Sequence, residues 1–450
     1  MVICKLRSIH LAALLLFSIC PGKGAAVADP IKPAAMVQAS MEIACQAPTA
    51  VHFQQIISRL PGPENHIHSL YNLDKSGWRA EVRVGLDMLF IERLLPHRSV
   101  GNTVIRYEEG PERRPRWMVV ASSSCLVTAV RRLDYDENGV VSKLHYLDAN
   151  FEEDRVTIDL NPPIPPYSQR KGILVAVVDT GVNYLLPEIN SRLSRDDAGQ
   201  VRGYDFWDLD RRPFDFNPIP TPFFPTHHGT KIASVIIRQS PDATIMPYRF
   251  PRSDMSRMGD LISHASENGA RIVNVSLASP ELEAWQGFLD AATEHSELLF
   301  IVAAGNHSQD IDINPIYPAV FSLENLVVVT ASTNRGYLAP YANWGVQSVD
   351  LIAPANEIQV MDFDGQSKWV GGSSYAAARV SGLVACWMSQ NPDMGLSEFR
   401  ERLFRKARRI KGGRMVRYGF LPESQFDGEG ICASAKQPFL RAEAEHGKNL

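Results

Sequence analysis

The sequence predicts a doubly wound α/β domain with a mostly parallel sheet, preceded by a smaller β-rich α+β domain. Three observations support this prediction. Before residue 160, apolar and charged residues alternate as in half-buried strands, whereas after residue 171 continuous apolar runs alternate with stretches of helical periodicity. Between these parts, Leu160–Tyr167 (LNPPIPPY) contains four prolines, which exclude helix and central strand and favour an extended linker.

The first part contains short local patterns. Apolar residues recur at helical spacing in 53–60, and charged and apolar residues alternate in 79–86 in the manner of a strand. Asn138-Gly139 lies between two apolar stretches and predicts a β-hairpin turn. Residues 156–160 alternate again immediately before the linker. We therefore expect mostly strands, with some helix.

The second part repeats a strand-then-helix order. The run 173–178 (ILVAVV) is apolar throughout, as expected of a parallel strand that is buried on both faces. Helical stripes follow at 258–265, ended by Gly269, and at 282–292. Further buried strands are predicted at 271–277, 298–303 and 326–331. In such a sheet, functional groups lie at strand ends and helix starts.

The composition is that of a globular protein that buries a sizeable core. Of 450 residues, 45% are apolar and 21% are charged, and the formal net charge is −4. No basic block is present, which argues against nucleic acid as a partner. After the N-terminal leader, no stretch reaches the roughly 18 apolar residues of a membrane span, so we expect no stable membrane insertion.

Residues 1–28 have the pattern of a signal peptide. Lys5 and Arg7 precede the apolar run 11–19, which is too short to span a bilayer, and Ala26-Val27-Ala28 supplies a cleavage site of small residues. The alternative is an uncleaved anchor. We expect a secreted or periplasmic protein, in a compartment where disulfides can form.

Export would leave four cysteines in the mature chain, and four cysteines allow three pairings. These cysteines are Cys45, Cys125, Cys386 and Cys432. The pairs Cys45–Cys125 and Cys386–Cys432 are favoured, because each pair then lies within one predicted domain. The alternative is that all four are free, buried thiols.

Asp179-Thr180-Gly181 directly follows the strand predicted at 173–178. The triplet alone is ambiguous, because aspartic proteases use it on a different fold. That interpretation needs a second Asp-Thr/Ser-Gly triplet to supply the partner carboxylate, and the sequence has none. The remaining alternative is that Asp179 merely ends a strand.

His228-Gly229-Thr230 opens a stretch of apolar and small residues at helical spacing. A single His is often structural, and the pair His227-His228 could indicate a metal. However, adjacent residues point in different directions, and no Cys, His or Asp cluster at ligand spacing supports a zinc site. We therefore predict no metal and no cofactor. Gly229 would let another backbone segment approach His228 closely.

Ser374 follows Gly371-Gly372-Ser373 and opens an Ala-rich helix. This places its hydroxyl at a helix N-terminus, where unpaired N–H groups can stabilise a developing oxyanion. The nucleophile turn of α/β-hydrolases reads Gly-x-Ser-x-Gly, but position 376 is Ala, and that fold has the order Ser, Asp, His. Here the order is Asp179, His228, Ser374.

That order, with the three local patterns, resembles the subtilisin family of serine peptidases over about residues 171–419. The resemblance implies that Asp179, His228 and Ser374 form a catalytic triad. Ala303-Ala304-Gly305-Asn306 is similar to the oxyanion-hole segment of the family. Asn306 would then donate a hydrogen bond to the tetrahedral intermediate.

The same resemblance implies a set of substrate-binding residues, namely Ser276, Leu277, Ala278, Ala304 and Gly305. Ala278 and Ser279 stand where the family generally has two glycines, so we expect the methyl group of Ala278 to narrow the primary specificity pocket. The Asn-rich calcium loop of many relatives is missing after His228, so no calcium is expected at that site.

The expected organisation is a signal peptide (1–28), a β-rich N-terminal domain (29–160), a Pro-rich linker (161–170), a peptidase domain (171–425) and a C-terminal tail (426–450). The signal-peptide pattern predicts export, and the resemblance implies a serine endopeptidase, made as a zymogen, that acts on proteins or peptides. The N-terminal domain would be either a pro-domain that inhibits the site intramolecularly or a retained accessory domain. Two alternatives stay open: a catalytically silent binding protein of the same fold, and a serine enzyme that processes or ligates one dedicated partner.

Overall fold

The structure, a computed structural model, describes residues 32–61, 65–73, 76–95, 102–168, 170–251, 254–409 and 415–426. The predicted signal peptide and nearly all of the predicted tail lie outside these ranges. The chain divides into two compact units, Met1–Thr128 and Ala129–Leu450. Among the helices of the described residues, none combines the length and the apolar character that crossing a membrane requires.

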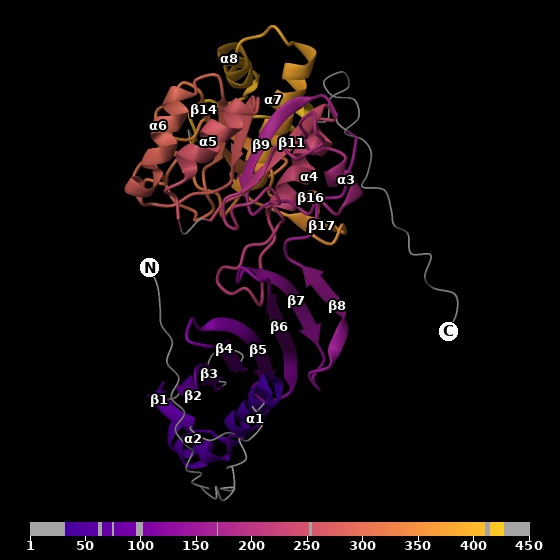
Figure 1. Cartoon of the computed structure of the whole chain (residues 1–450). Helices are drawn as coiled ribbons and strands as arrows, with labels where there is room; N and C mark the ends of the chain where they lie inside the picture. Colours follow the sequence, from indigo (N-terminus) through magenta and orange to yellow (C-terminus); the bar gives the residue numbers. More distant parts are fainter. Residues whose placement is uncertain are drawn as a thin grey trace, which may run out of the picture. The chain divides into compact units, whose positions relative to one another are not determined.

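The first unit packs helices against one face of an antiparallel sheet (Figure 1). The core between them includes Phe53 and Trp78, whose ring centroids are 4.5 Å apart, and the indole N–H of Trp78 donates to the carbonyl of Ala47 at 2.9 Å. A disulfide joins Cys45 to Cys125, so this predicted pairing is confirmed. The elements are α1 (Pro33–Gln46), α2 (Ala50–Ile56), η1 (Ile57–Arg59), β1 (Asn65–Asn72), β2 (Gly77–Val84), β3 (Asp87–Leu94), β4 (Asn102–Glu109) and β5 (Arg114–Ser122), and each strand pairs with the next.

The second unit opens with three antiparallel strands, of which the first begins two residues before the boundary: β6 (Val127–Tyr135), β7 (Val141–Leu147) and β8 (Glu153–Asp159). Asn138-Gly139 lies in the turn between β6 and β7, so the predicted hairpin is confirmed. Gly139 has a φ of 79°, a conformation that few residues other than glycine adopt readily. The prolines at 162–166 then lie outside any helix or strand, as their sequence predicts.

The rest of the second unit contains a parallel sheet in the order β10-β11-β9-β12-β13-β14-β15-β18. Every neighbouring pair in it is parallel, which confirms the predicted fold class. The chain runs from β9 to β11 on one side and then to β12 on the other, so the strand order reverses at β9. The strands are β9 (Ile173–Asp179), β10 (Tyr204–Asp205), β11 (Ala243–Arg249), β12 (Ile272–Val275), β13 (Leu299–Ala303), β14 (Leu326–Ser332), β15 (Leu351–Pro354) and β18 (Gly419–Phe420).

Successive residues of each buried strand point to opposite sides of the sheet. Because these residues are apolar, both faces of the sheet are hydrophobic, and helices cover both. Val175 and Val177 of β9 pack with α4 (Gly229–Gln239) and α7 (Ser373–Gln390), whereas Ala176 and Val178 pack with α5 (Met258–Glu267) and α6 (Gln286–Glu294). The remaining elements are α3 (Pro187–Asn190), η3 (Leu282–Trp285), α8 (Leu396–Lys406), η4 (Glu423–Gln425) and the hairpin of β16 (Ile358–Met361) and β17 (Ser367–Val370).

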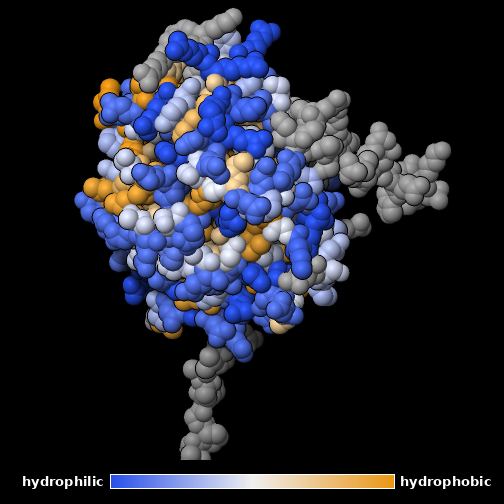
Figure 2. Space-filling view, turned by 90° about the horizontal axis from the view of Figure 1, so that it is seen from above, coloured by the Kyte–Doolittle hydropathy of each residue, from blue (hydrophilic) through white to orange (hydrophobic). Residues whose placement is uncertain are grey.

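Hydrophobic residues lie mostly inside these layers. The face drawn in Figure 2 is largely hydrophilic, with its hydrophobic residues in small groups. Cys386 is buried in α7, and its predicted partner Cys432 lies outside the described residues, so this second pairing stays a prediction.

Candidate active site

Asp179 is the last residue of β9, the inner strand at which the strand order reverses, so it lies at the carboxyl end of the parallel strands. Ligands of open α/β sheets bind at such positions, because the loops that leave neighbouring strands diverge there and form a crevice. The Asp179 residue is only 2% exposed. Its carboxylate accepts a hydrogen bond from the backbone N–H of Thr180 at 2.8 Å.

His228 immediately precedes α4, and its ring meets the carboxylate of Asp179. The ring Nδ1 is 2.8 Å from Oδ2 and 2.9 Å from Oδ1. This approach requires Gly229, because a Cβ atom there would lie 2.0 Å from the carbonyl oxygen of Gly181. The sequence-based expectation of a close backbone approach is therefore confirmed.

The electrostatic surroundings favour a protonated imidazole. Burial lowers the pKa of His228, but the negative charge and hydrogen bond of Asp179, together with the negative charge of Asp215, outweigh it, so the pKa is raised above its ordinary value. The side chain is 32% exposed, which leaves part of the ring open to the cleft.

Ser374 is the second residue of α7 and lines the same cleft as Asp179 and His228, a cavity of about 420 Å³. It lies in the first turn, where the backbone N–H groups of a helix have no intrahelical partner and the helix dipole is positive. Three side chains from different elements, β9, the turn before α4 and the start of α7, therefore meet in one cleft.

Asn306 enters the cleft from the loop after β13. Its carboxamide oxygen accepts from the backbone N–H of Ser373 at 2.9 Å, which leaves the amide N–H groups available to another acceptor. In the same loop the N–H of Gly305 donates to the Ser373 hydroxyl at 3.1 Å. These two bonds join the loop to the start of α7.

The predicted substrate-binding residues divide into two groups. Ser276, Leu277, Ala278 and Gly305 line the cleft. Ala304 is fully buried beneath it, in the core on the α5–α6 side of the sheet. Ser279, the next residue after Ala278, pairs with Tyr317 through two backbone hydrogen bonds of 3.1 and 2.9 Å, which anchors the segment that follows β12.

Sequence reasoning missed two residues that support the site. Asn343 donates to the Ala304 carbonyl at 2.9 Å and accepts from the His307 N–H at 2.8 Å, so it holds both sides of the Asn306 loop. Asp215 lies behind Asp179 and His228 and bonds to both of their segments. Neither residue is in a short motif, since each contacts the site only after the chain has folded.

Within the described part of the chain, no group of three or more His, Cys, Asp or Glu side chains is placed to hold a metal ion. His227, which next to His228 could have indicated a metal site, instead contacts Asp215 and Phe363. Its Nδ1 lies 2.5 Å from the carbonyl oxygen of Asp215, and its ring stacks on Phe363 with centroids 3.8 Å apart.

Comparison with known proteins adds an independent finding. Residues 170–425 match the subtilase family. A thermophilic serine proteinase of Bacillus sp. (strain AK1) is 27% identical over 54% of this chain and 59% of its own length. Alkaline serine exoprotease A of Vibrio alginolyticus is 27% identical over 50% of this chain and 40% of its own. This chain thus spans between 40 and 59% of the length of these two relatives.

Among solved structures, a cold-adapted subtilisin-like serine proteinase matches 59% of this chain and 94% of its own chain. The sequence identity is 24% and the TM-score is 0.47.

Proposed function

This chain belongs to the subtilase family, and from that premise we propose that it is an exported serine endopeptidase that cleaves peptide bonds through Asp179, His228 and Ser374. The observation that carries the proposal is that the Asp179–His228 hydrogen bond of 2.8 Å lies in the same cleft as Ser374. Family membership alone supports only a serine peptidase, so these residue roles rest on the geometry.

The chemistry follows from the ordinary reactivity of these groups. The Ser374 hydroxyl attacks the carbonyl carbon of the scissile bond while the His228 Nε2 takes its proton. His228 then gives that proton to the leaving amine as the C–N bond breaks, which leaves an acyl-enzyme. Water, activated by His228, hydrolyses the ester and restores Ser374. Asp179 at Nδ1 keeps Nε2 unprotonated at the start and stabilises the imidazolium that forms.

The oxyanion of the tetrahedral intermediate would lie between the backbone N–H of Ser374 and the amide N–H of Asn306. The Ser373 N–H holds the oxygen of the Asn306 carboxamide at 2.9 Å, so the nitrogen is oriented before substrate arrives. Loss of one such donor raises the barrier by about 3–4 kcal/mol, a magnitude measured in a subtilisin.

Substrate would bind as an extended chain along Ser276-Leu277-Ala278. The cleft wall at Ala278 carries a methyl group, which supports the expectation that small or medium side chains are preferred at the cleaved position. Proteins and peptides are the substrate class that family membership supports.

Export and domain organisation are also part of this proposal. Export is supported by the signal-peptide pattern of residues 1–28 and by the Cys45–Cys125 disulfide, which is typical of proteins outside the reducing cytosol. We assign residues 29–160 to a pro- or accessory domain, 161–170 to a linker and 171–425 to the peptidase domain.

Cleavage of a peptide library by the purified chain and by Ser374→Ala tests the proposal. Internal bonds should be cut by the wild type only, and intact mass should show whether the chain is cut near residue 170. Removal of terminal residues alone would contradict endopeptidase action. Equal cleavage by both proteins would contradict the role of Ser374.

A further inference from the structure

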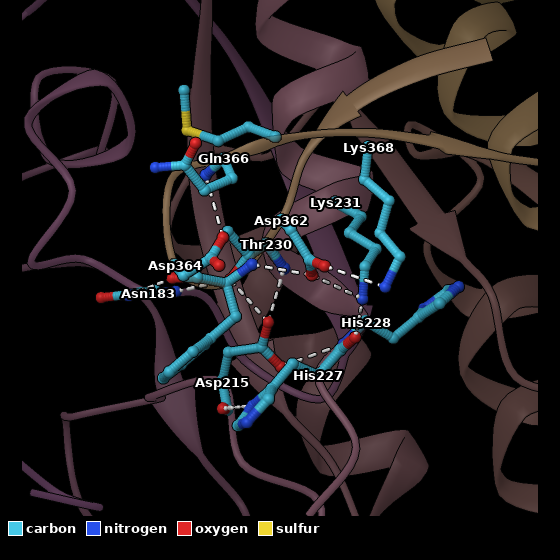
Figure 3. A network of polar contacts seen from close by, with 12 residues as sticks. Asn183, Asp215, His227, His228, Thr230, Lys231, Asp362, Asp364, Gln366 and Lys368 are labelled. Atoms are coloured by element: carbon cyan, nitrogen blue, oxygen red, sulfur yellow. Dashed lines mark hydrogen bonds and ion pairs between the residues drawn. The ribbon is translucent and has the colours of Figure 1, made fainter. Parts of the chain in front are cut away.

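Asp215 is a buried carboxylate that contacts Thr180, the neighbour of Asp179, and the backbone of His228. It is 0% exposed and accepts four hydrogen bonds. Figure 3 draws it with two of its partners, His228 and Thr230. Its Oδ1 accepts from the Thr180 hydroxyl at 2.6 Å and from the His228 backbone N–H at 3.2 Å. Its Oδ2 accepts from the N–H and the hydroxyl of Thr230 at 2.9 and 2.5 Å. One carboxylate thus bonds to the turn after β9 and to the turn that opens α4.

The surrounding bonds favour donation by both threonine hydroxyl groups to Asp215. The Thr180 hydroxyl oxygen accepts from the N–H groups of Gly229 at 2.9 Å and His228 at 3.1 Å, and the Thr230 hydroxyl oxygen accepts from the Asn183 N–H at 2.8 Å. The Thr230 hydroxyl is therefore left to donate its hydrogen to Asp215. The Thr180 hydroxyl also lies 3.2 Å from Asp179 Oδ1, but its contact with Asp215 is shorter, at 2.6 Å, which favours donation to Asp215. Four donors and no acceptor then face this side chain, an arrangement that suits the ionised carboxylate.

We propose that Asp215 is a positioning residue of the catalytic site, which ties the segments of Asp179 and His228 together and holds a second negative charge behind the His228 imidazole. This inference rests on the proposed function in one respect, the role of His228 as the catalytic base. The position of Asp215 and its hydrogen bonds do not depend on it. The imidazole becomes an imidazolium during each acyl transfer, and a fixed buried charge stabilises that cation more than a solvated charge would.

Other charged and titratable groups also lie near His228, on the end of β9, on α4 and on α7. Asp179 binds Nδ1, and Tyr375 of α7 lies with its ring centroid 5.6 Å from that of His228. Lys231 of α4 opposes the negative charges, but its Nζ is 2.9 Å from Asp362, which also binds Lys368 at 3.1 Å. The charges that act on the pKa of His228 are those of Asp179, Asp215 and Lys231, and the titratable side chains of His227 and His307 line the same cleft.

Burial raises the pKa of Asp215 above its ordinary value, and the charge of His227 and the hydrogen bonds from Thr180 and Thr230 offset only part of that rise. Among the charges that raise the pKa of His228, Asp215 comes after Asp179. Removing the Asp215 charge should therefore lower the pKa of His228 and also slow acyl transfer, because the imidazolium is less stabilised.

Asp205 provides a matched control. It is also fully buried, and it pairs with Arg249 at 2.9 Å, whose Nε donates to the Phe216 carbonyl next to Asp215 at 2.7 Å. Asp205→Asn thus perturbs a buried carboxylate of the same region that makes no contact with His228. It should lower the melting temperature and leave the pKa of His228 unchanged.

The test measures the pKa of His228 directly, by NMR of the imidazole in the full chain carrying Ser374→Ala. Adding Asp215→Asn should lower this pKa by about half a unit or more, and adding Asp205→Asn should not. In the active enzyme, Asp215→Asn should lower kcat at least about tenfold, move the acid limb of kcat/KM to lower pH and change KM less. An unchanged His228 pKa in folded Asp215→Asn overturns the proposal.

A second measurement needs no substitution at Asp215 and so does not depend on that variant folding. The carboxyl carbon of Asp215, followed by ¹³C NMR in the Ser374→Ala chain, should report an ionised group throughout the titration of His228. A protonated Asp215 in that range overturns the proposal. Both NMR readouts are independent of turnover, so a wild-type chain that cleaves no peptide would contradict the proposed function alone.

Discussion

Removal of the Cys45–Cys125 disulfide should strongly destabilise the first unit. The bond joins residues separated by 80 positions. In the chain-entropy treatment, closing a loop of that length removes about 15 cal/mol/K from the unfolded state, which at 25 °C is about 4.5 kcal/mol. Small domains are stable by about 5–15 kcal/mol in total, so the double variant Cys45→Ala/Cys125→Ala should leave this unit marginally folded.

Pulse proteolysis over a guanidinium gradient, with fragments identified by mass, reports the unfolding of the first unit separately from the second. The wild type should lose stability when a reductant is added, whereas the double variant, already lacking this bond, should lose none in the first unit. A change below about 1 kcal/mol in both the reduced wild type and the double variant would refute the reasoning. The native geometry or the denatured ensemble would then offset the loop entropy.

The geometry of the cleft leads to three more expectations. Burial lowers the pKa of His228, but Asp179 and Asp215 together raise it by more, so the neutral base is lost as pH falls through a value above the ordinary pKa of histidine. The acid limb of kcat/KM should lie there, and a midpoint below the ordinary pKa of histidine would count against it. Asn306→Ala should lower kcat about 10²–10³-fold with little change in KM, and a change confined to KM would argue against an oxyanion role. Ala278→Gly should increase cleavage after large side chains in a peptide library relative to the wild type, and an identical profile would remove Ala278 from the pocket wall.

The elements that position the site could be predicted from the sequence because each carries a strong local pattern. The apolar run of β9 is buried on both faces, and Asp179 follows it directly. His228 and Ser374 each adjoin the start of a helix. These patterns depend on neighbouring residues alone, so they can be recognised without knowing which parts of the chain meet.

Other features depend on contacts between distant segments. Asp215 precedes a loop rich in proline, and nothing in its neighbours indicates that its carboxylate binds Thr180 and Thr230. In the first unit, α1 escaped the sequence analysis because small and polar residues interrupt its apolar residues, which leaves no clear stripe. It is buried nevertheless, since it packs on a sheet that supplies the partner surface.

The most direct test of Ser374 as a nucleophile activated by His228 and Asp179 is labelling of the purified chain with a fluorophosphonate, followed by peptide mapping. Such a probe reacts with a serine whose hydroxyl is activated by a base and whose adduct an oxyanion hole can hold. We expect one adduct, at Ser374, formed more slowly as pH falls through the pKa of His228 and absent in Asp179→Asn and His228→Ala. Labelling that persists unchanged in those variants, or that maps to another serine, would contradict it.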